Sequence, residues 1–210
     1  MEAILDIYAQ PIDPDYPRLC FDERPCLLLD NVVEPLPMKE GKAKRVDYEY
    51  KRSGTAVVLL AYNMDTGQRH AIVSDTKNKV DYATFIAHVM DTHYSQSKGV
   101  HLIQDNLNTH TKGSFYKTFD PITARKYAKK LQFHFTPKHG SWLNMAEIEF
   151  SALSRQCLNR RFDSVQTMTK QIEAWQIERN KKMVKIHWSF TVMEAQEKLA
   201  RHYYQVFDKY

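Results

Sequence analysis

"HLIQDNLNTH" occupies residues 101–110 and decides the fold of this chain. Its apolar pair, Leu102 and Ile103, is typical of a short buried strand. The strand ends abruptly at Asp105 and Asn106, two residue types that favour turns. Asp105 could therefore simply end the strand. Alternatively, the strand could hold the carboxylate of Asp105 at the edge of a sheet, where it would be available for chemistry.

The segments before this strand predict a hairpin and a helix. Residues 54–74, "GTAVVLLAYNMDTGQRHAIVS", hold two β-prone runs separated by a turn with Asp and Gly, which is typical of a hairpin. Residues 80–94, "VDYATFIAHVMDTHY", place apolar side chains at helical spacing. This spacing predicts an amphipathic helix.

The N-terminal quarter predicts more β-structure and a charged loop. Residues 18–35, "RLCFDERPCLLLDNVVEP", indicate a strand, a break at Pro25 and a second strand that ends before Pro35. Residues 36–53 are charged and contain a glycine, so we expect a loop there. It is either an ordinary solvated loop or a candidate phosphate-facing surface. Residues 1–18 are interrupted by prolines and predict a lead-in segment.

The C-terminal half predicts one more strand, "QFHFTP" at residues 132–137, among helices. The helical segments are residues 122–131, 139–162, about 164–181 and about 190–205. Ser141 or Asn144 could cap the second of them. With residues 18–35 counted as one interrupted strand, the chain order is three strands, a helix, a strand, a helix, a strand and then helices. This order predicts an α/β fold in which helices cover both faces of a mixed sheet.

Composition limits the class of protein. The 210 residues suffice for one sizeable domain, and a net charge of +5 with a pI near 9.0 is compatible with a polyanionic partner. No apolar run approaches the roughly 18 residues of a membrane span, and the N-terminus lacks the basic region of a signal peptide. Cys20, Cys26 and Cys157 show no paired spacing. We therefore expect reduced, buried thiols in a cytoplasmic protein.

Three acidic residues lie where strands and a helix could present them to one site. Asp22 lies on the first strand, Asp105 ends the fourth, and Glu147 lies one turn into the helix after the fifth. If the first and fourth strands are neighbours, Asp22 and Asp105 lie side by side and repel each other unless a cation separates them. Mg²⁺ prefers such oxygen ligands, and a pair of ions supports in-line phosphoryl displacement.

The residues alone leave other interpretations open. Asp22 could pair locally with Arg24, and Asp105 could be only a turn residue. Glu147 competes with Glu149, because both flank the apolar stripe of their helix at about 100° per residue.

Five segments considered together are more specific: "CFDERP", "DYEYKRSGT", "LIQDNLNTH", "TPKHGSWLNMAEIEF" and "WQIERNKKMVKIHWSFT". In this order they resemble transposases of the insertion sequence family 630, which belongs to the mariner superfamily of DDE transposases. The similarity runs from about residue 8 to residue 200. It implies an RNase H-like fold: a mixed five-stranded sheet, an antiparallel meander plus parallel strands, flanked by helices.

The resemblance also implies a catalytic, metal-binding triad. The first two aspartates of the family fall on Asp22 and Asp105, and its final acid falls on Glu147. Glu149 then becomes an ordinary flanking acid. The triad would bind Mg²⁺, with two ions expected and Mn²⁺ as a substitute. The 42 positions between its last two acids exceed the usual spacing, which we attribute to an enlarged basic helix in "KTFDPITARKYAKK".

The chain departs from the family at its N-terminus. Helix-turn-helix DNA-binding modules usually precede the catalytic domain, whereas about twenty residues precede Asp22 here. We therefore expect residues 1–210 to be a single catalytic domain, with residues 1–18 as lead-in and residues 164–210 as C-terminal helices. Such a chain would be a separately encoded reading frame, a truncated copy or a fragment, and a separate helix-turn-helix subunit would be its partner.

The expected function is that of a metal-dependent DNA endonuclease and strand transferase that cuts and joins transposon ends. Its partners would be double-stranded DNA, as terminal repeats and target, and a second copy in a homodimer, in the cytoplasm or on a bacterial nucleoid. The rivals are a nuclease or resolvase that does not join DNA, and an inactive truncated remnant. The candidate DNA contacts are His110, Lys138, His139, Arg125, Lys126, Lys129 and Lys130. His110 could instead support Asp105, and Trp142 is expected in the core rather than stacked on a base.

Overall fold

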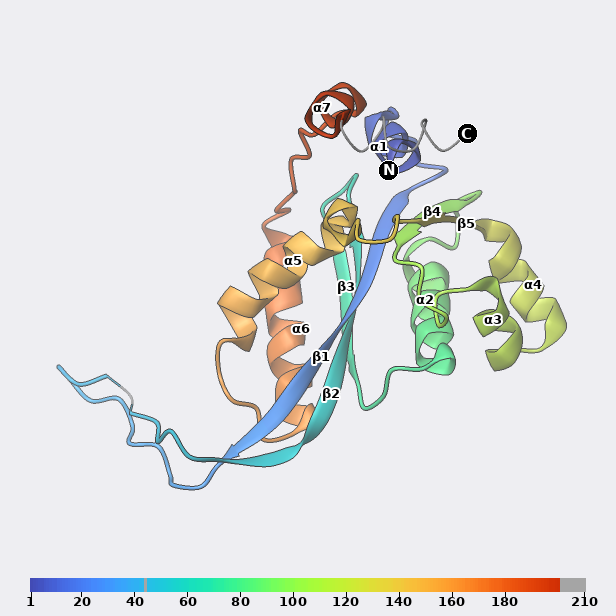
Figure 1. Ribbon diagram of the computed structural model, residues 1–210. Helices are drawn as coiled ribbons and strands as arrows, with labels where there is room; N and C mark the ends of the chain where they lie inside the picture. The colour runs from blue at the N-terminus through green and yellow to red at the C-terminus, as the bar shows by residue number, and fades with distance from the viewer. Residues whose placement is uncertain (44, 201–210) are drawn as a thin grey trace.

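The computed structural model describes residues 1–43 and 45–200, and its centre is a sheet with the strand order β3-β2-β1-β4-β5 (Figure 1). The strands are β1 Arg18–Asn31, β2 Tyr50–Asn63, β3 Arg69–Ser74, β4 Val100–Gln104 and β5 Leu131–Phe135. The first three form an antiparallel meander, and β4 and β5 extend it in parallel to β1. The predicted mixed five-stranded sheet is confirmed.

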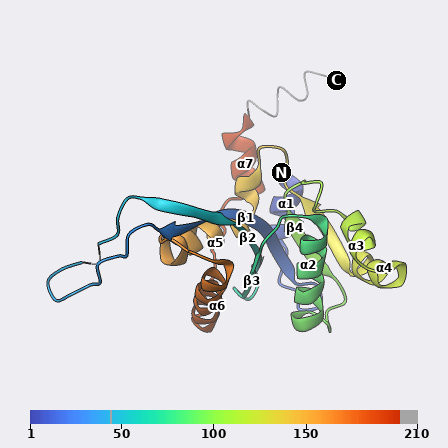
Figure 2. The same ribbon diagram turned by 90° about the horizontal axis from the view of Figure 1, so that it is seen from below.

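Helices cover both faces of this sheet (Figures 1 and 2). They are α2 Lys79–His93, α3 Lys112–Thr118, α4 Pro121–Lys130, α5 Met145–Leu153 and α6 Val165–Lys181. α5 and α6 lie on one face, and α2 lies on the other with α3 and α4 beside it. Because successive strand side chains point to opposite faces, Cys20 packs in the core with residues of α5 and α6, and Phe21 packs in the core with residues of α2.

Two terminal helices, α1 (Glu2–Ala9) and α7 (Val192–Lys198), contact each other at one end of the molecule (Figure 1). The lead-in segment, residues 1–18, thus contains a helix that its sequence did not indicate. The helix expected at residues 190–205 begins as α7, while residues 201–205 lie outside the described residues. Among the described residues, none of the helices is both long and apolar enough to cross a membrane.

β1 runs without interruption through Pro25, so the predicted break at this residue is wrong. Pro25 pairs with Val57 of β2, whereas the register of β1 with β4 covers Arg18–Cys20. Pro25 therefore lies where β1 has become an edge strand on its β4 side, a position that tolerates proline. β2 begins at Tyr50, so residues 50–53 belong to a strand rather than to the predicted loop.

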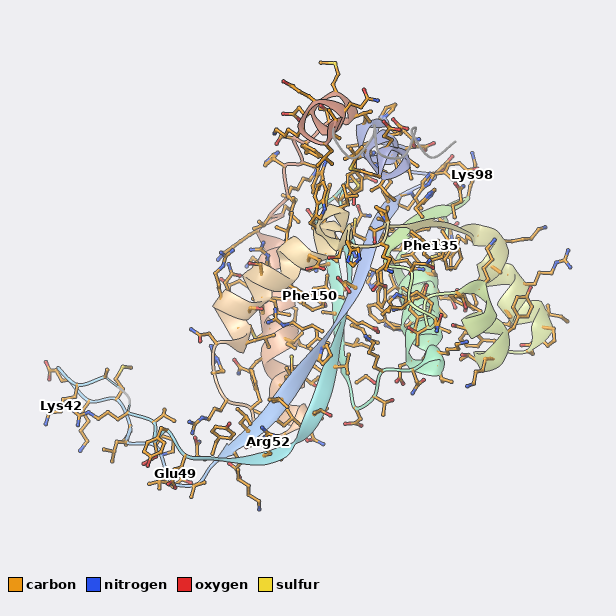
Figure 3. All side chains as sticks on the ribbon, viewed as in Figure 1. Lys42, Glu49, Arg52, Lys98, Phe135 and Phe150 are labelled. Atoms are coloured by element: carbon orange, nitrogen blue, oxygen red, sulfur yellow. The ribbon has the colours of Figure 1, made fainter. Side chains whose placement is uncertain are left out.

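Residues 32–49, apart from residue 44, which is not described, form an arm that projects beyond the paired parts of β1 and β2 (Figures 1 and 3). Lys42 and Glu49 lie along it in Figure 3. An isolated antiparallel bridge joins Leu36 to Arg45. The charged loop expected here is thus an exposed arm, and its contact with phosphate stays a prediction.

The helix predicted at residues 80–94 is confirmed as α2, and its apolar stripe is buried. The basic helix predicted at residues 122–131 is confirmed as α4, but its expected enlargement over residues 117–130 is wrong, because residues 117 and 118 belong to the separate helix α3. Asp120 caps α4 by accepting the N–H of Ile122, and Pro121 begins the helix. A capping Asp followed by Pro is typical of a helix start, so the sequence "DP" at residues 120–121 indicated that a new helix begins there.

Candidate active site

The parallel pairing of β1 with β4 brings two acidic residues to the same edge of the sheet. Cys20 is in register with Ile103, and two further residues along each chain lead to Asp22 and Asp105. Cys20 and Ile103 pack in the same core, so the alternation of side chains directs Asp22 toward the face that α5 covers, while Asp105 directly follows the last residue of β4. The first and fourth strands are neighbours, which is the condition that a shared site for the two acids requires.

Glu147 approaches this edge from α5. Asn144 caps the helix through its side-chain oxygen, and its side-chain nitrogen donates to the carbonyl of Phe21 at 2.8 Å. Because Phe21 directly precedes Asp22, this hydrogen bond fixes the first turn of α5 beside the first acid. Glu147 is the third residue of the helix and is exposed. Of the two expected caps, Asn144 and not Ser141 is the N-cap of α5.

The charges of the other two acids act on Asp22. Burial, together with the charges of Glu147 and Asp105, raises the pKa of Asp22 to about 7, although the N–H of Glu23 donates to it. A divalent cation relieves repulsion of this kind, and carboxylate oxygens are the ligands that Mg²⁺ prefers. Within residues 1–43 and 45–200, no three or more His, Cys, Asp or Glu side chains lie close enough together to hold an ion. The donors thus fit a hard divalent ion in their chemistry but do not converge on one point here.

His110 contacts the second acid directly. Its Nδ1 lies 2.5 Å from Oδ1 of Asp105, and its Nε2 lies 3.5 Å from Oε1 of Glu23. Burial by itself would lower the pKa of His110, but the hydrogen bonds and charges of the two carboxylates raise it to about 9. Because the ring is fully buried, its position favours support of Asp105 over contact with a DNA phosphate.

Glu149 is not an ordinary flanking acid, so that expectation is wrong. Its side chain is fully buried, and its Oε2 lies 2.9 Å from Nε of Arg69 and 3.0 Å from Nε of Arg179. This ionic cluster ties α5 to β3 and α6. Local helical geometry did not indicate it, because both arginines are distant in the sequence.

The basic residues of α4 differ in whether their side chains contact other parts of the protein. Lys126 Nζ lies 3.3 Å from Asp91 of α2, and Lys130 Nζ donates to a main-chain carbonyl just after α2 at 2.5 Å. Arg125 and Lys129 are exposed. Two of the four residues of this helix that were predicted to contact DNA, Lys126 and Lys130, therefore already contact other groups of the protein.

The connection between β5 and α5 presents exposed polar and aromatic side chains just before the helix that carries Glu147. Lys138 and His139 are exposed, and His139 has a φ of 64°, which is uncommon for a residue other than glycine. The 3₁₀ turn Ser141–Leu143 follows. Trp142 within it is 46% exposed and packs edge-on against Phe190, so its expected place in the core is wrong.

Sequence reasoning missed Glu23 and Lys77. The Glu23 side chain is only 3% exposed, and its Oε1 lies 2.6 Å from Nζ of Lys77. The signal in the sequence was the pair Asp22 and Glu23 in "CFDER". Adjacent residues of a strand point to opposite faces of the sheet, so Glu23 cannot share the surroundings of Asp22. A second acid there needs its own partners.

A mixed sheet in which β1 lies beside β4, with Asp22 on β1 and Asp105 directly after β4, defines the class of RNase H-like domains. A family profile described as "DDE superfamily endonuclease" (DDE_3) matches residues 17–169. The chain belongs to this family. No curated protein matches its sequence.

Solved structures of the Mos1 mariner transposase share the RNase H-like fold. The isolated catalytic domain of Mos1 matches with a TM-score of 0.55 and 13% identity, over 89% of this chain and 91% of that one. The Mos1 mariner paired end complex with Mn matches with a TM-score of 0.56 and 14% identity, over 87% and 55%. The Mos1 strand transfer complex matches with a TM-score of 0.55 and 13% identity, over 90% of this chain and 60% of that one. The chain thus spans little more than half the length of the transposase chains in these complexes.

Proposed function

We propose that this chain is the catalytic domain of a transposase of the insertion sequence family 630, which cuts transposon-end DNA and joins it to a target. The main support is that one edge of the sheet receives Asp22 from β1, Asp105 from β4 and Glu147 from α5. Membership of the DDE superfamily endonucleases agrees with this arrangement. So does a fold shared with a mariner transposase.

The three acids would act together as ligands. Asp22 and Asp105 would hold Mg²⁺, or Mn²⁺ in its place, from adjacent strands, and Glu147 would add its carboxylate from α5. A pair of such ions supplies activation of the attacking water or DNA 3′-hydroxyl and stabilisation of the leaving oxygen. Solved Mos1 complexes are described with Mn and with Mg, which agrees with this choice of ion.

DNA would approach the exposed connection that precedes α5. Lys138 and His139 are suited to the phosphate backbone, and Trp142 offers a ring on which a base could stack. Arg125 and Lys129 would extend the basic surface. Such contacts give affinity that depends on salt and not on sequence. Recognition of the terminal repeats would come from helix-turn-helix modules outside this domain.

Residues 1–210 would act as a single catalytic domain within a larger assembly. The Mos1 structures are described as paired-end and strand-transfer complexes, which supports two copies working together on two DNA ends. We expect a homodimer on DNA for this chain as well.

The test is nicking of supercoiled plasmid with Mg²⁺ or Mn²⁺ by the wild type and by Asp105→Ala. We expect metal-dependent nicking by the wild type and a loss of about 100-fold or more in the variant. The matched control is Glu173→Gln, which removes one negative charge from an exposed position of α6. Equal nicking by Asp105→Ala and the wild type would show that the proposed site is wrong.

A second assay separates the transposase from its rivals. A duplex with a free 3′-hydroxyl end is incubated with target plasmid and metal, and joined products are counted. Cleavage without joining would indicate a resolvase-like nuclease. Neither cleavage nor joining by folded protein would indicate an inactive remnant.

A further inference from the structure

A chain of charged groups lies behind Asp105, and its two central members, His110 and Glu23, are buried. Oδ1 of Asp105 contacts Nδ1 of His110 at 2.5 Å, and Nε2 of the same ring faces Oε1 of Glu23 at 3.5 Å. Lys77 then contacts this oxygen of Glu23 at 2.6 Å. The four side chains connect the end of β4 to β1 and to the segment before α2, and their charges alternate.

The His110 ring is immobilised from both sides. It stacks on Tyr82 with 4.9 Å between ring centroids, and the ring of Phe21 meets it edge-on at 5.1 Å. The main chain is fixed too, because Nε2 of Gln104 donates to the His110 carbonyl at 2.8 Å while Oε1 of Gln104 accepts from the Tyr82 hydroxyl. The imidazole therefore cannot swing away from Asp105 without disturbing a packed core.

Glu23 is on the wrong face of β1 to be a ligand beside Asp22. Adjacent residues of a strand point to opposite faces, and Glu23 points toward His110 and α2 while Asp22 points toward α5. Nε2 of His110 is buried and has no hydrogen-bond partner within the described residues. The Glu23 carboxylate lies 3.5 Å from it, so the two groups are arranged for each other.

We propose that Glu23 and His110 are positioning residues: Glu23 orients the His110 ring, and the ring fixes the Asp105 carboxylate for metal binding. Partners of this kind behind metal ligands typically contribute about 10- to 100-fold in metal affinity or activity. This inference rests on the proposed function, because it requires Asp105 to be a ligand.

The test measures Mn²⁺ binding by the electron paramagnetic resonance signal of free Mn²⁺, without relying on activity. Glu23→Gln keeps the shape of the side chain but removes its charge. His110→Asn keeps an amide donor near the position of Nδ1 but breaks the link to Glu23. We expect both variants to bind Mn²⁺ about 10- to 100-fold more weakly than the wild type. Their melting temperatures should fall somewhat, because both side chains are buried in ionic contacts, whereas their metal-free DNA affinities should stay close to the wild-type values.

The controls separate this inference from the proposed function. Asp105→Asn should abolish Mn²⁺ binding, and Glu173→Gln should leave it unchanged. If Asp105→Asn binds Mn²⁺ like the wild type, the proposed function fails. If Asp105→Asn fails to bind while Glu23→Gln and His110→Asn bind normally, only the positioning role is overturned. It is also overturned if the two variants lose metal-free DNA affinity and thermal stability in parallel with metal affinity, because that pattern indicates general disruption.

Discussion

The side-chain amide of Asn144 donates a 2.8 Å hydrogen bond to the main-chain carbonyl of Phe21, a residue 123 positions earlier in the chain. The same side chain caps α5. One residue thus starts the helix that carries Glu147 and ties that helix to the strand that carries Asp22.

Replacing Asn144 with Ala should affect both stability and catalysis. We expect a loss of about 1–3 kcal/mol in the free energy of unfolding, because a cap and a buried hydrogen bond disappear together. Cleavage should fall by about 10- to 100-fold, because Glu147 is no longer held in place. Urea denaturation and plasmid nicking measure the two effects. Asn78→Ala is the matched control, since Asn78 caps α2 in the same way at an exposed position. It should cost about 1 kcal/mol and leave cleavage nearly unchanged.

Glu147 and Glu149 should respond in opposite ways to the same substitution. Glu147→Gln alters an exposed side chain, so the free energy of unfolding should change by less than about 0.5 kcal/mol while cleavage is lost. Glu149→Gln leaves Arg69 and Arg179 without their carboxylate in a buried site and should cost about 3–5 kcal/mol. Denaturation midpoints and nicking rates on folded protein distinguish the two. Equal stability losses would contradict the assignment of Glu149 to a structural cluster.

The protein should lose stability in mild acid because of His70. Burial, with the nearby His93 and His88, lowers the pKa of His70 from 6.5 to about 3. Between these pH values the unfolded chain binds a proton that the folded protein does not, so the free energy of unfolding falls as the pH falls. From pH 6.5 to pH 5 this residue should cost about 1–2 kcal/mol.

The variant His70→Gln isolates this effect. Denaturation in urea at pH 7 and pH 5 should show a smaller difference between the two pH values for the variant than for the wild type. The free energy of unfolding at pH 7, where His70 is largely neutral in both states, measures any packing that the substitution removes. An unchanged difference would mean that His70 does not resist protonation in the folded protein.

Lys138 and Lys126 should differ in their effect on DNA binding. Lys138 is exposed in the connection before α5, whereas Lys126 contacts Asp91 of α2. Lys138→Ala should reduce the slope of log affinity against log salt by about 0.9, the value expected for one lost phosphate contact. Lys126→Ala should leave the slope nearly unchanged. Binding titrations without metal at several salt concentrations provide the measurement, and equal slopes for both variants would contradict the proposed path of DNA.

Much of the fold was predictable because its signals are local. The hairpin of β2 and β3 followed from a turn with Asp and Gly between two β-prone runs, and α2 followed from its buried stripe. The continuity of β1 was not predictable in this way. A proline, which has no N–H, disrupts a strand only where a neighbouring strand needs a donor at that position. That need depends on where β4 stops, which no local pattern records.

The candidate site divides in the same way. The sequence by itself determined the acids available to it and, through the order of the motifs, favoured Asp22, Asp105 and Glu147. Only the tertiary structure decided that Glu149 is buried between two arginines, that Trp142 is exposed, and that His110 connects Asp105 to Glu23. The physical reason is distance along the chain. Strand alternation and helix periodicity are set by neighbouring residues, whereas the partners of a buried charge are set by which distant elements pack together.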